Sequence, residues 1–146
     1  MFSIRPATPA DSRALAALYT ELGYPATTDE MYARLARVIT DPAHAVLVAE
    51  LTQSRAVAGA VHVAIYPILD SDGAAQIIGL AVASAQQRQG FGRALMERAE
   101  RWARDRHCRT VYLRTNILRT DAHSFYARLG YTNAKTQFVF QKRLPQ

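Results

Sequence analysis

Apolar positions recur along this chain with two distinct spacings. Short runs rich in Val, Ile and aromatic residues predict strands. Apolar residues spaced three or four apart, as in Leu15, Leu18 and Leu22, predict amphipathic helices. The predicted strands cover residues 2–5, 45–51, 57–66, 74–82, 111–114 and 136–141. The predicted helices cover residues 12–22, 29–39, 90–106 and 121–129.

The predicted elements follow the order β-α-α-β-β-β-α-β-α-β. This alternation predicts an α/β fold, in which helices cover both faces of a mixed sheet. Asp11 is the expected cap of the first helix, and Thr28 or Asp29 is the expected cap of the second. The 146 residues contain no repeat, low-complexity tract or linker. One hydrophobic core can serve a chain of this length, so we expect a single domain over residues 1–146.

The composition narrows the setting in which the protein is expected to work. Apolar residues make up 49% of the chain, but no run of 18 or more is free of charge, so we expect no membrane span. The N-terminal residues lack the pattern of a secretion signal. Cys108 is the single cysteine and allows no internal disulfide, which favours a cytoplasmic protein. The four histidines are scattered, so we expect no metal site.

The net charge of +6 is concentrated in one part of the chain. Residues 88–128 hold ten arginines against four acidic residues, whereas the rest of the chain is neutral. This excess favours a polyanionic small ligand. Nucleic acid would also fit the charge, but the aromatic residues are not interleaved with the arginines as a stacking platform requires. We therefore expect no nucleic-acid partner.

The segment Gln87–Arg93 carries the most specific chemistry. It separates a predicted strand from a predicted helix and contains two closely spaced glycines, Gly90 and Gly92. Glycine permits a positive φ and the close approach of a ligand, and the free N–H groups at a helix start bind phosphate. A dinucleotide site would need a third glycine after the first strand, and a Walker loop would need Gly-Lys-Ser/Thr; neither pattern is present here. We therefore expect a different diphosphate-bearing ligand.

Two motifs make the chain resemble the GNAT acetyltransferases. Gln87-x-x-Gly90-x-Gly92 is similar to that family's acetyl-CoA turn. The segment 113–131, in which Phe125-Tyr126 precedes Gly130-Tyr131, resembles the family's final helix. It looks most like the branch with aminoglycoside 6′-type and aminoalkylphosphonate N-acetyltransferases. The resemblance implies a mostly antiparallel central sheet flanked by helices, with a splayed strand pair that receives CoA.

The resemblance also implies which residues hold acetyl-CoA, the expected co-substrate. Backbone N–H groups of the glycine turn would hold the pyrophosphate, and the preceding strand would run beside the pantetheine. Tyr126 is implied as the general acid that protonates the leaving thiolate. Asn116 either contacts the cofactor or caps the next segment, and His123 is expected to make a structural hydrogen bond. The expected cofactor-binding residues are Leu80, Ala81, Val82, Gln87, Arg88, Gln89, Gly90, Phe91, Gly92, Arg93, Asn116 and Ser124.

No carboxylate occupies the place where many relatives carry a general base. That place lies on the strand before the glycine turn, and residues 76–79 read Gln-Ile-Ile-Gly. Among the alternatives His62 has the most suitable intrinsic pKa, although a lone strand histidine is more often structural. An amine of low pKa, or proton loss to solvent, would make a base unnecessary. The candidates are Glu21, Tyr24, His62, Tyr66, Asp70 and Asp72.

These features predict an N-acetyltransferase that moves acetyl from acetyl-CoA directly to a primary amine of a small molecule or peptide. The alternative is a CoA-binding regulatory or sensor domain without activity, which the missing strand carboxylate favours and Tyr126 opposes. The acceptor is expected over the early helices and the connection Tyr66–Asp72. Its identity stays open among aminoglycosides, aminophosphonates, polyamines, amino acids and peptides. Many relatives are homodimers, so the resemblance implies one here.

Overall fold

The computed structural model describes residues 1–70 and 73–146, which form two compact units, Met1–Arg114 and Thr115–Gln146. The strands of the first unit are β1 (Phe2–Pro6), β2 (His44–Leu51), β3 (Val57–Ile65), β4 (Ala75–Val82) and β5 (Val111–Leu113). Its helices are α1 (Ser12–Leu22), α2 (Thr28–Val38) and α3 (Phe91–Asp105), with short 3-10 turns η1 (Pro9–Asp11) and η2 (Ser84–Gln86). The second unit contains α4 (Thr120–Arg128). The predicted helices and first five predicted strands are therefore confirmed, with small shifts at their ends.

The sheet has the strand order β1-β2-β3-β4-β5. The first four strands run antiparallel, and β5 is parallel to β4. Within the described residues, β5 pairs with β4 only from Ala75 to Ile77. Beyond that point, residues 78–82 of β4 have β3 on one side and no paired strand on the other. This is the mostly antiparallel sheet with a splayed strand pair that the family resemblance implied.

A β-bulge interrupts the pairing of β3 with β4. His62 lies opposite Gly79, and the next residue, Val63, lies opposite Ile77, so Ile78 is the extra residue on β4. A bulge leaves the backbone of the extra residue without its ladder partner and bends the strand. Ile78 is 40% exposed, although it lies in an otherwise well-covered strand. The bulge therefore falls where β4 loses its pairing with β5.

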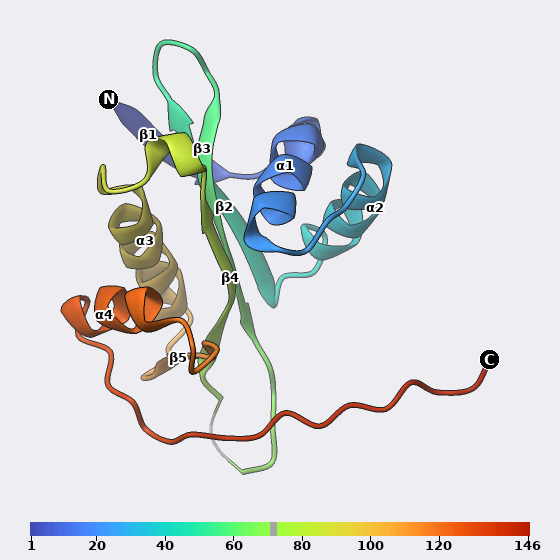
Figure 1. The fold of residues 1–146 in the computed structure, drawn as a ribbon, viewed down its shortest axis with the longest axis vertical. Helices are drawn as coiled ribbons and strands as arrows, with labels where there is room; N and C mark the ends of the chain where they lie inside the picture. The colour runs from blue at the N-terminus through green and yellow to red at the C-terminus, as the bar shows by residue number, and fades with distance from the viewer. Residues whose placement is uncertain (71–72) are drawn as a thin grey trace. The chain divides into compact units, whose positions relative to one another are not determined.

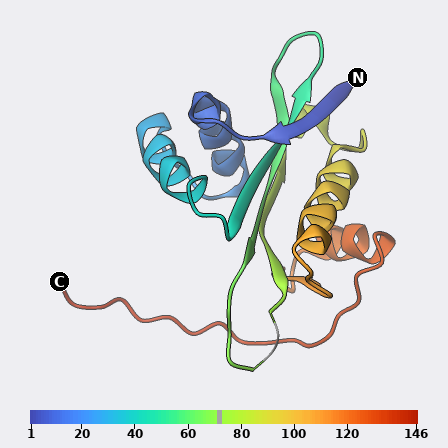
Figure 2. The ribbon, with the colours of Figure 1, turned by 180° about the vertical axis from the view of Figure 1, so that it is seen from behind.

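Helices cover both faces of the sheet, as predicted (Figures 1 and 2). The helices α1 and α2 bury Leu15, Leu18 and Leu35 against the face that carries Val48 and Ala60. On the opposite face α3 buries Leu95, Met96 and Ala99, all completely covered. Successive strand residues point to opposite faces, so Ala60 and His62 share the face of α1 and α2, whereas Val61 and Val63 point toward α3.

An ion-pair cluster holds the start of α1 against the sheet. Arg5 donates two parallel hydrogen bonds to the carboxylate of Asp11, at 2.8 and 2.9 Å, and a third to Glu50 on β2. Asp11 is at the N-cap position, as predicted, but its carboxylate accepts from the N–H of Thr8 at 2.8 Å and not from the helix. The Arg5 hydrogen bonds lower the pKa of Asp11 below its usual range.

The cap of α2 differs from the prediction by one or two positions. Thr27, and neither Thr28 nor Asp29, is the N-cap residue. The Thr27 hydroxyl accepts from the N–H of Glu30 at 3.1 Å, and the Glu30 carboxylate accepts from the N–H of Thr27 at 2.9 Å. This reciprocal pair is a capping box, which satisfies two backbone donors at once. The prediction overlooked the glutamate three residues after Thr27.

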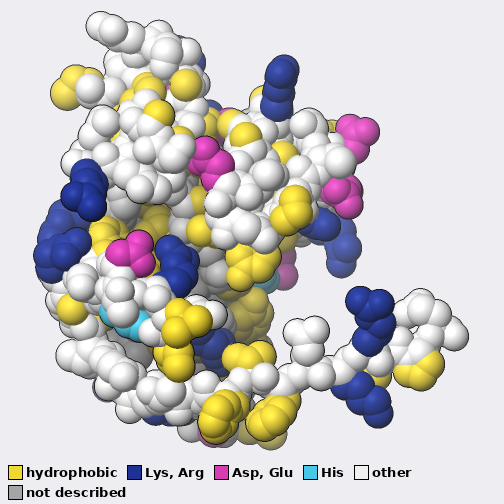
Figure 3. All heavy atoms as spheres, in the orientation of Figure 1, with side chains coloured by type: hydrophobic (Ala, Val, Ile, Leu, Met, Phe, Trp, Pro, Cys, Tyr) yellow, Lys and Arg dark blue, Asp and Glu magenta, His cyan; other side chains and the backbone are white. Residues whose placement is uncertain are grey.

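The predicted last strand, 136–141, is not formed. The described chain has no regular secondary structure after Gly130, whose positive φ of 95° ends the α4 segment. Phe138, Val139 and Phe140 are 91, 82 and 91% exposed. Figure 3 shows apolar and basic side chains exposed along this segment. A strand pattern is stable only when a neighbouring strand accepts its hydrogen bonds and its apolar face is covered. The observed element order therefore ends at α4.

Among the described residues no helix combines the length and the apolar character needed to cross a bilayer.

Candidate functional site

The glycine turn joins β4 to α3 through η2. Gly90 is the N-cap residue of α3 and has a left-handed backbone, with φ 89°. A Cβ at this position would meet nothing within 4 Å, so the backbone conformation, and not crowding, favours glycine. The first hydrogen bond of the helix runs from the N–H of Ala94 to the carbonyl of Gly90, at 3.1 Å. The N–H groups of residues 91–93 therefore have no partner within the helix and are available to an anion.

The other residues of the turn support this arrangement. Arg88 also has a positive φ, 64°, which is unusual for a residue with a side chain and bends the turn sharply. Phe91 is buried, and its ring lies 4.6 Å from the ring of Phe2, which fastens the start of α3 to β1. Gly92 lies inside the first turn of α3. The exposed guanidinium of Arg93 is 3.6 Å from Glu97 and remains accessible to a phosphate.

A carboxylate from α1 holds the segment between β4 and the turn. Glu21 accepts a hydrogen bond from the backbone N–H of Ser84 at 3.1 Å and another from the Ser84 hydroxyl at 3.0 Å. Both oxygens of this candidate base are therefore engaged in positioning the loop. The two residues are 63 positions apart, so spacing along the sequence carries no signal of this contact.

The strand before the turn offers an open edge to an extended ligand. Leu80, Ala81 and Val82 lie in the part of β4 that β5 does not pair with. Ala81 is buried in the core beside α1, whereas Leu80 and Val82 are half-buried. An unpaired strand edge presents N–H and C=O groups that an extended ligand can bind. The first unit therefore brings together the predicted residues of β4 and of the glycine turn.

The remaining predicted cofactor residues belong to the second unit. The side chain of Asn116 accepts from the N–H of Leu118 at 2.9 Å and so forms a tight turn before α4, whose N-cap residue is Arg119. The carbonyl of Asn116 contacts Nε2 of His123 at 2.9 Å, and this is the structural hydrogen bond expected of that histidine. The Ser124 hydroxyl donates to the carbonyl of Thr120 at 3.2 Å and stays exposed.

Tyr126, the predicted general acid, lies near the end of α4. Its half-buried ring lies 5.1 Å from the ring of Phe125 and 5.9 Å from that of Tyr131. Burial raises the pKa of the Tyr126 hydroxyl, with a smaller opposing effect of Arg119. The phenol therefore stays protonated at neutral pH, as a proton donor must.

A tyrosine that the sequence did not single out covers the bulge of β4. A Cβ added to Gly79 would lie 2.7 Å from the hydroxyl oxygen of Tyr19, which comes from α1. Burial raises the pKa of Tyr19, so its hydroxyl stays protonated. Gly79 is next to the bulged residue Ile78, and its missing Cβ leaves room for the Tyr19 hydroxyl. Tyr19 occupies an apolar position of the helical pattern because its ring packs in the core. The pattern therefore does not show that its hydroxyl approaches Gly79.

The candidate bases occupy very different surroundings. His62 lies on β3 with Nε2 only 2.8 Å from Nδ1 of His44, and burial and the nearby His44 lower its pKa to about 4. Tyr66 packs edge-on against His44 at 5.8 Å. Tyr24 and Asp70 are exposed. Asp72 lies outside the described residues.

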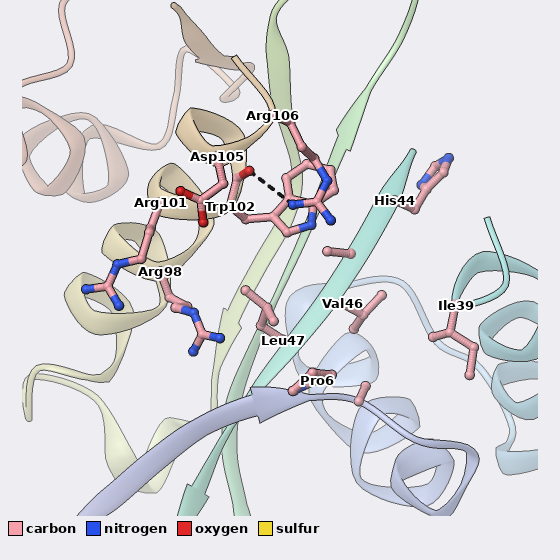
Figure 4. A pocket seen from close by; sticks show the side chains of 12 residues that line it. Pro6, Ile39, His44, Val46, Leu47, Arg98, Arg101, Trp102, Asp105 and Arg106 are labelled. Atoms are coloured by element: carbon pink, nitrogen blue, oxygen red, sulfur yellow. Dashed lines mark hydrogen bonds between the residues drawn. The ribbon is translucent and has the colours of Figure 1, made fainter. Parts of the chain in front are cut away.

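A separate hollow of about 560 Å³ lies between the start of β2 and the C-terminal half of α3 (Figure 4). Arg106 lies with its guanidinium 4.3 Å above the ring of Trp102 and donates to the Trp102 carbonyl at 3.3 Å. Arg98 and Arg101 come from the same helix. This hollow is at the end of α3 opposite the glycine turn and therefore does not belong to the phosphate site.

Known structures share this fold over nearly their whole length. A transcriptional regulator from Bacillus halodurans is 22% identical, with a TM-score of 0.87, and the match covers 97% of this chain and all of that one. An aminoglycoside antibiotic 6′-N-acetyltransferase from Acinetobacter baumannii is 19% identical, with a TM-score of 0.86 and coverage of 99% and 100%. A glucosamine-6-phosphate N-acetyltransferase from Arabidopsis thaliana is 21% identical, with a TM-score of 0.83 and coverage of 97% and 98%. At these identities the likeness shows the fold.

The sequence profile of the acetyltransferase (GNAT) family matches residues 12–131, which is most of the chain. The match includes the glycine turn, the unpaired half of β4 and α4. The chain therefore belongs to the acetyltransferase (GNAT) family.

Proposed function

We propose that this protein is an N-acetyltransferase that moves the acetyl group of acetyl-CoA directly to a primary amine of a small molecule or peptide. The observation that carries the proposal is the left-handed turn at Gly90, whose free N–H groups follow a strand with an unpaired edge. The proposal includes one acetyltransferase domain over residues 1–146. It also includes a cytoplasmic setting, in which acetyl-CoA is available and Cys108 stays reduced.

The cofactor would lie along β4 in a direction set by the phosphate site. The pyrophosphate binds the N–H groups at the start of α3, with Arg88 and Arg93 adding positive charge. The pantetheine then runs back along the open edge of β4, beside Val82, Ala81 and Leu80. Continuing in this direction, the thioester reaches Gly79 and the bulge at Ile78.

The chemical step needs a nucleophile, a leaving group and two proton transfers. The amine nitrogen attacks the carbonyl carbon of the thioester, the bond between carbon and sulfur breaks, and the thiolate leaves. The Tyr126 hydroxyl donates a proton to that sulfur, while the amine nitrogen loses a proton. Holding both substrates in one complex supplies much of the rate by positioning.

A turnover assay tests the proposal. Acetyl-CoA is incubated with a panel of primary amines that contains neamine, glucosamine 6-phosphate, spermidine, an amino acid and a short peptide. We expect release of free CoA thiol with at least one amine, and mass spectrometry should find the acetylated product. Tight CoA binding without thiol release on any amine would contradict the enzyme.

That contrary result would support the second candidate, a CoA-binding regulatory or sensor domain. Two observations favour it: β4 carries no carboxylate from Gln76 to Gly79, and one similar structure is a transcriptional regulator. The protonated phenol of Tyr126 favours the enzyme, because a CoA sensor has no use for a proton donor.

A further inference from the structure

The amine proton needs an acceptor, and the course of β4 brings a residue of β3 close to the thioester. This inference rests on the proposed function, in which the thioester ends at Gly79. Gly79 lies opposite His62 of β3. Directly opposite residues of an antiparallel pair point to the same face, with Cβ positions about 5 Å apart. His62 therefore flanks the thioester end of the cofactor on the face covered by α1 and α2.

His62 is joined to the surface by a second histidine. Nε2 of His62 is 2.8 Å from Nδ1 of His44, and Nε2 of His44 is 3.8 Å from the Asp41 carboxylate. The His44 side chain is 17% exposed, and that of Asp41 is 51% exposed. Within the described residues, Nδ1 of His62 makes no hydrogen bond. The chain of groups thus runs from a ring nitrogen of the half-buried His62 that makes no hydrogen bond to an exposed carboxylate.

Other titratable and charged groups face this pair from the surrounding elements. The protonated phenol of Tyr19 comes from α1, and Arg34 and Arg37 of α2 line a small hollow with Asp41 and His44. These groups supply no competing base near His62.

Three further segments contribute neighbours to the pair. Tyr66 packs on His44 from the end of β3. Tyr112 of β5 donates to the side chain of Gln76 at 3.1 Å, next to β3 on the same face. Asp105 at the end of α3 and Arg106, the residue after it, border the hollow that His44 also lines. Among the contacts of the described residues, the carboxylate 3.8 Å from Nε2 of His44 is that of Asp41, which is therefore placed to stabilise a cation there.

We propose that the proton of the acceptor amine leaves through His62 and His44 toward Asp41. Nδ1 of His62 accepts the proton from the amine nitrogen as Nε2 of His62 releases its own proton to Nδ1 of His44. The new positive charge then rests on His44, beside the Asp41 carboxylate, and the buried imidazole of His62 is neutral before and after the transfer.

The low pKa of His62 is compatible with its role as a proton acceptor in the relay. Burial and His44 lower the pKa of His62 to about 4, so the ring is neutral and able to accept at pH 7. A base of such low pKa would hold a proton poorly by itself. Because the partner nitrogen gives up a proton in the same step, the charge appears on His44, where partial hydration and the Asp41 carboxylate stabilise it.

Kinetics of three variants test the relay with the first amine of the panel that gives turnover. His62→Gln should lower kcat about 100-fold at pH 7, within the usual range for a positioned base, and His44→Gln about 10-fold. In both variants the rate should rise with pH until the amine deprotonates by itself, so the acidic limb of the profile moves to higher pH. Affinity for CoA, measured by calorimetry, should stay unchanged. The matched control is His107→Gln, an exposed histidine after α3, which should match the wild type.

The possible outcomes separate the relay from the enzyme. If the wild type releases thiol and His62→Gln keeps the wild-type rate and pH profile, the relay is wrong and the enzyme stands. If the wild type releases thiol with none of the amines, the proposed function fails and the relay fails with it.

Nitrogen-detected NMR of the imidazoles in the full chain tests the pair without turnover. We expect Nε2 of His62 and Nδ1 of His44 to share one proton through their hydrogen bond, and His62→Gln should change the signal of Nδ1 of His44. Two rings that share no proton would overturn the relay. This measurement also decides the case if His62→Gln proves unstable.

Discussion

At the scale of single residues, Gly79 shows how one missing Cβ shapes the candidate reaction centre. Gly79→Ala would place a methyl group 2.7 Å from the Tyr19 hydroxyl oxygen, which is closer than the atoms can approach. We expect a loss of about 1–3 kcal/mol in the free energy of unfolding, as for other overpacked sites. Urea denaturation followed by circular dichroism would measure it.

Tyr19→Phe provides the matched background for this variant. It removes the hydroxyl oxygen, and the nearest remaining ring atom is 3.5 Å from the position of the added methyl group, an ordinary contact. Gly79→Ala should therefore cost much less stability in the Tyr19→Phe protein than in the wild type. Equal costs in the two backgrounds would show that the hydroxyl is not what excludes a side chain.

Tyr126 is the residue on which proton donation to sulfur depends. Tyr126→Phe keeps the ring packed between Phe125 and Tyr131 but removes the proton. We expect kcat to fall about 100-fold, with CoA affinity unchanged, because the phenol acts only as the thiolate leaves. Steady-state kinetics and calorimetry separate the two effects. Tyr32→Phe, at an exposed position of α2, is the control, and a wild-type kcat in Tyr126→Phe would refute the acid role.

At the scale of elements, Glu21 couples α1 to the loop before the phosphate site. Glu21→Ala removes both hydrogen bonds to Ser84, so the loop and the glycine turn become less ordered before CoA binds. A loss of about 1 kcal/mol, typical of an exposed hydrogen bond to a charged group, corresponds to an increase in Kd for CoA of about fivefold. Calorimetric titration with CoA measures it. Asp29→Asn, in the exposed first turn of α2, should leave Kd unchanged, and the idea fails if Glu21→Ala behaves likewise.

Local sequence pattern is sufficient to predict the helices, but it does not show whether the predicted last strand forms. The stretch 136–141 has the β-branched and aromatic residues of a strand, yet Phe138 and Phe140 are exposed and no strand forms there. Helices such as α3 satisfy their hydrogen bonds internally, so their pattern predicts them well. A strand depends on a partner, and the sequence pattern does not report whether one is available.

At the scale of the whole molecule, the half-buried His62 makes stability depend on pH. Its folded pKa of about 4 lies below the ordinary value of 6.5, so the unfolded chain binds the proton more tightly. Stability is therefore fully present above about pH 6.5 and declines as the pH falls toward 4. The loss should be about 2 kcal/mol, allowing for the partial exposure of the ring.

Urea denaturation at a series of pH values checks this expectation. His62→Gln should remove the decline between pH 6.5 and 4. A second decline at lower pH should remain in that variant, because the lowered pKa of Asp11 stabilises the fold only while its carboxylate is ionised. An unchanged slope between pH 6.5 and 4 in His62→Gln would assign that decline to other groups.

Local patterns in the chain were enough to predict the helices, the first five strands and the glycine turn, and two motifs were enough to indicate the family. Apolar spacing reports the period of an element, and Gly90 reports a backbone conformation that few other residues adopt. The contacts between distant positions became visible only in the folded chain. His44 and His62 meet because the β2–β3 register places Val46 opposite His62, and Tyr19 reaches Gly79 because α1 packs on the bulged strand. Register and packing arise from the whole fold, so no spacing along the chain can show them.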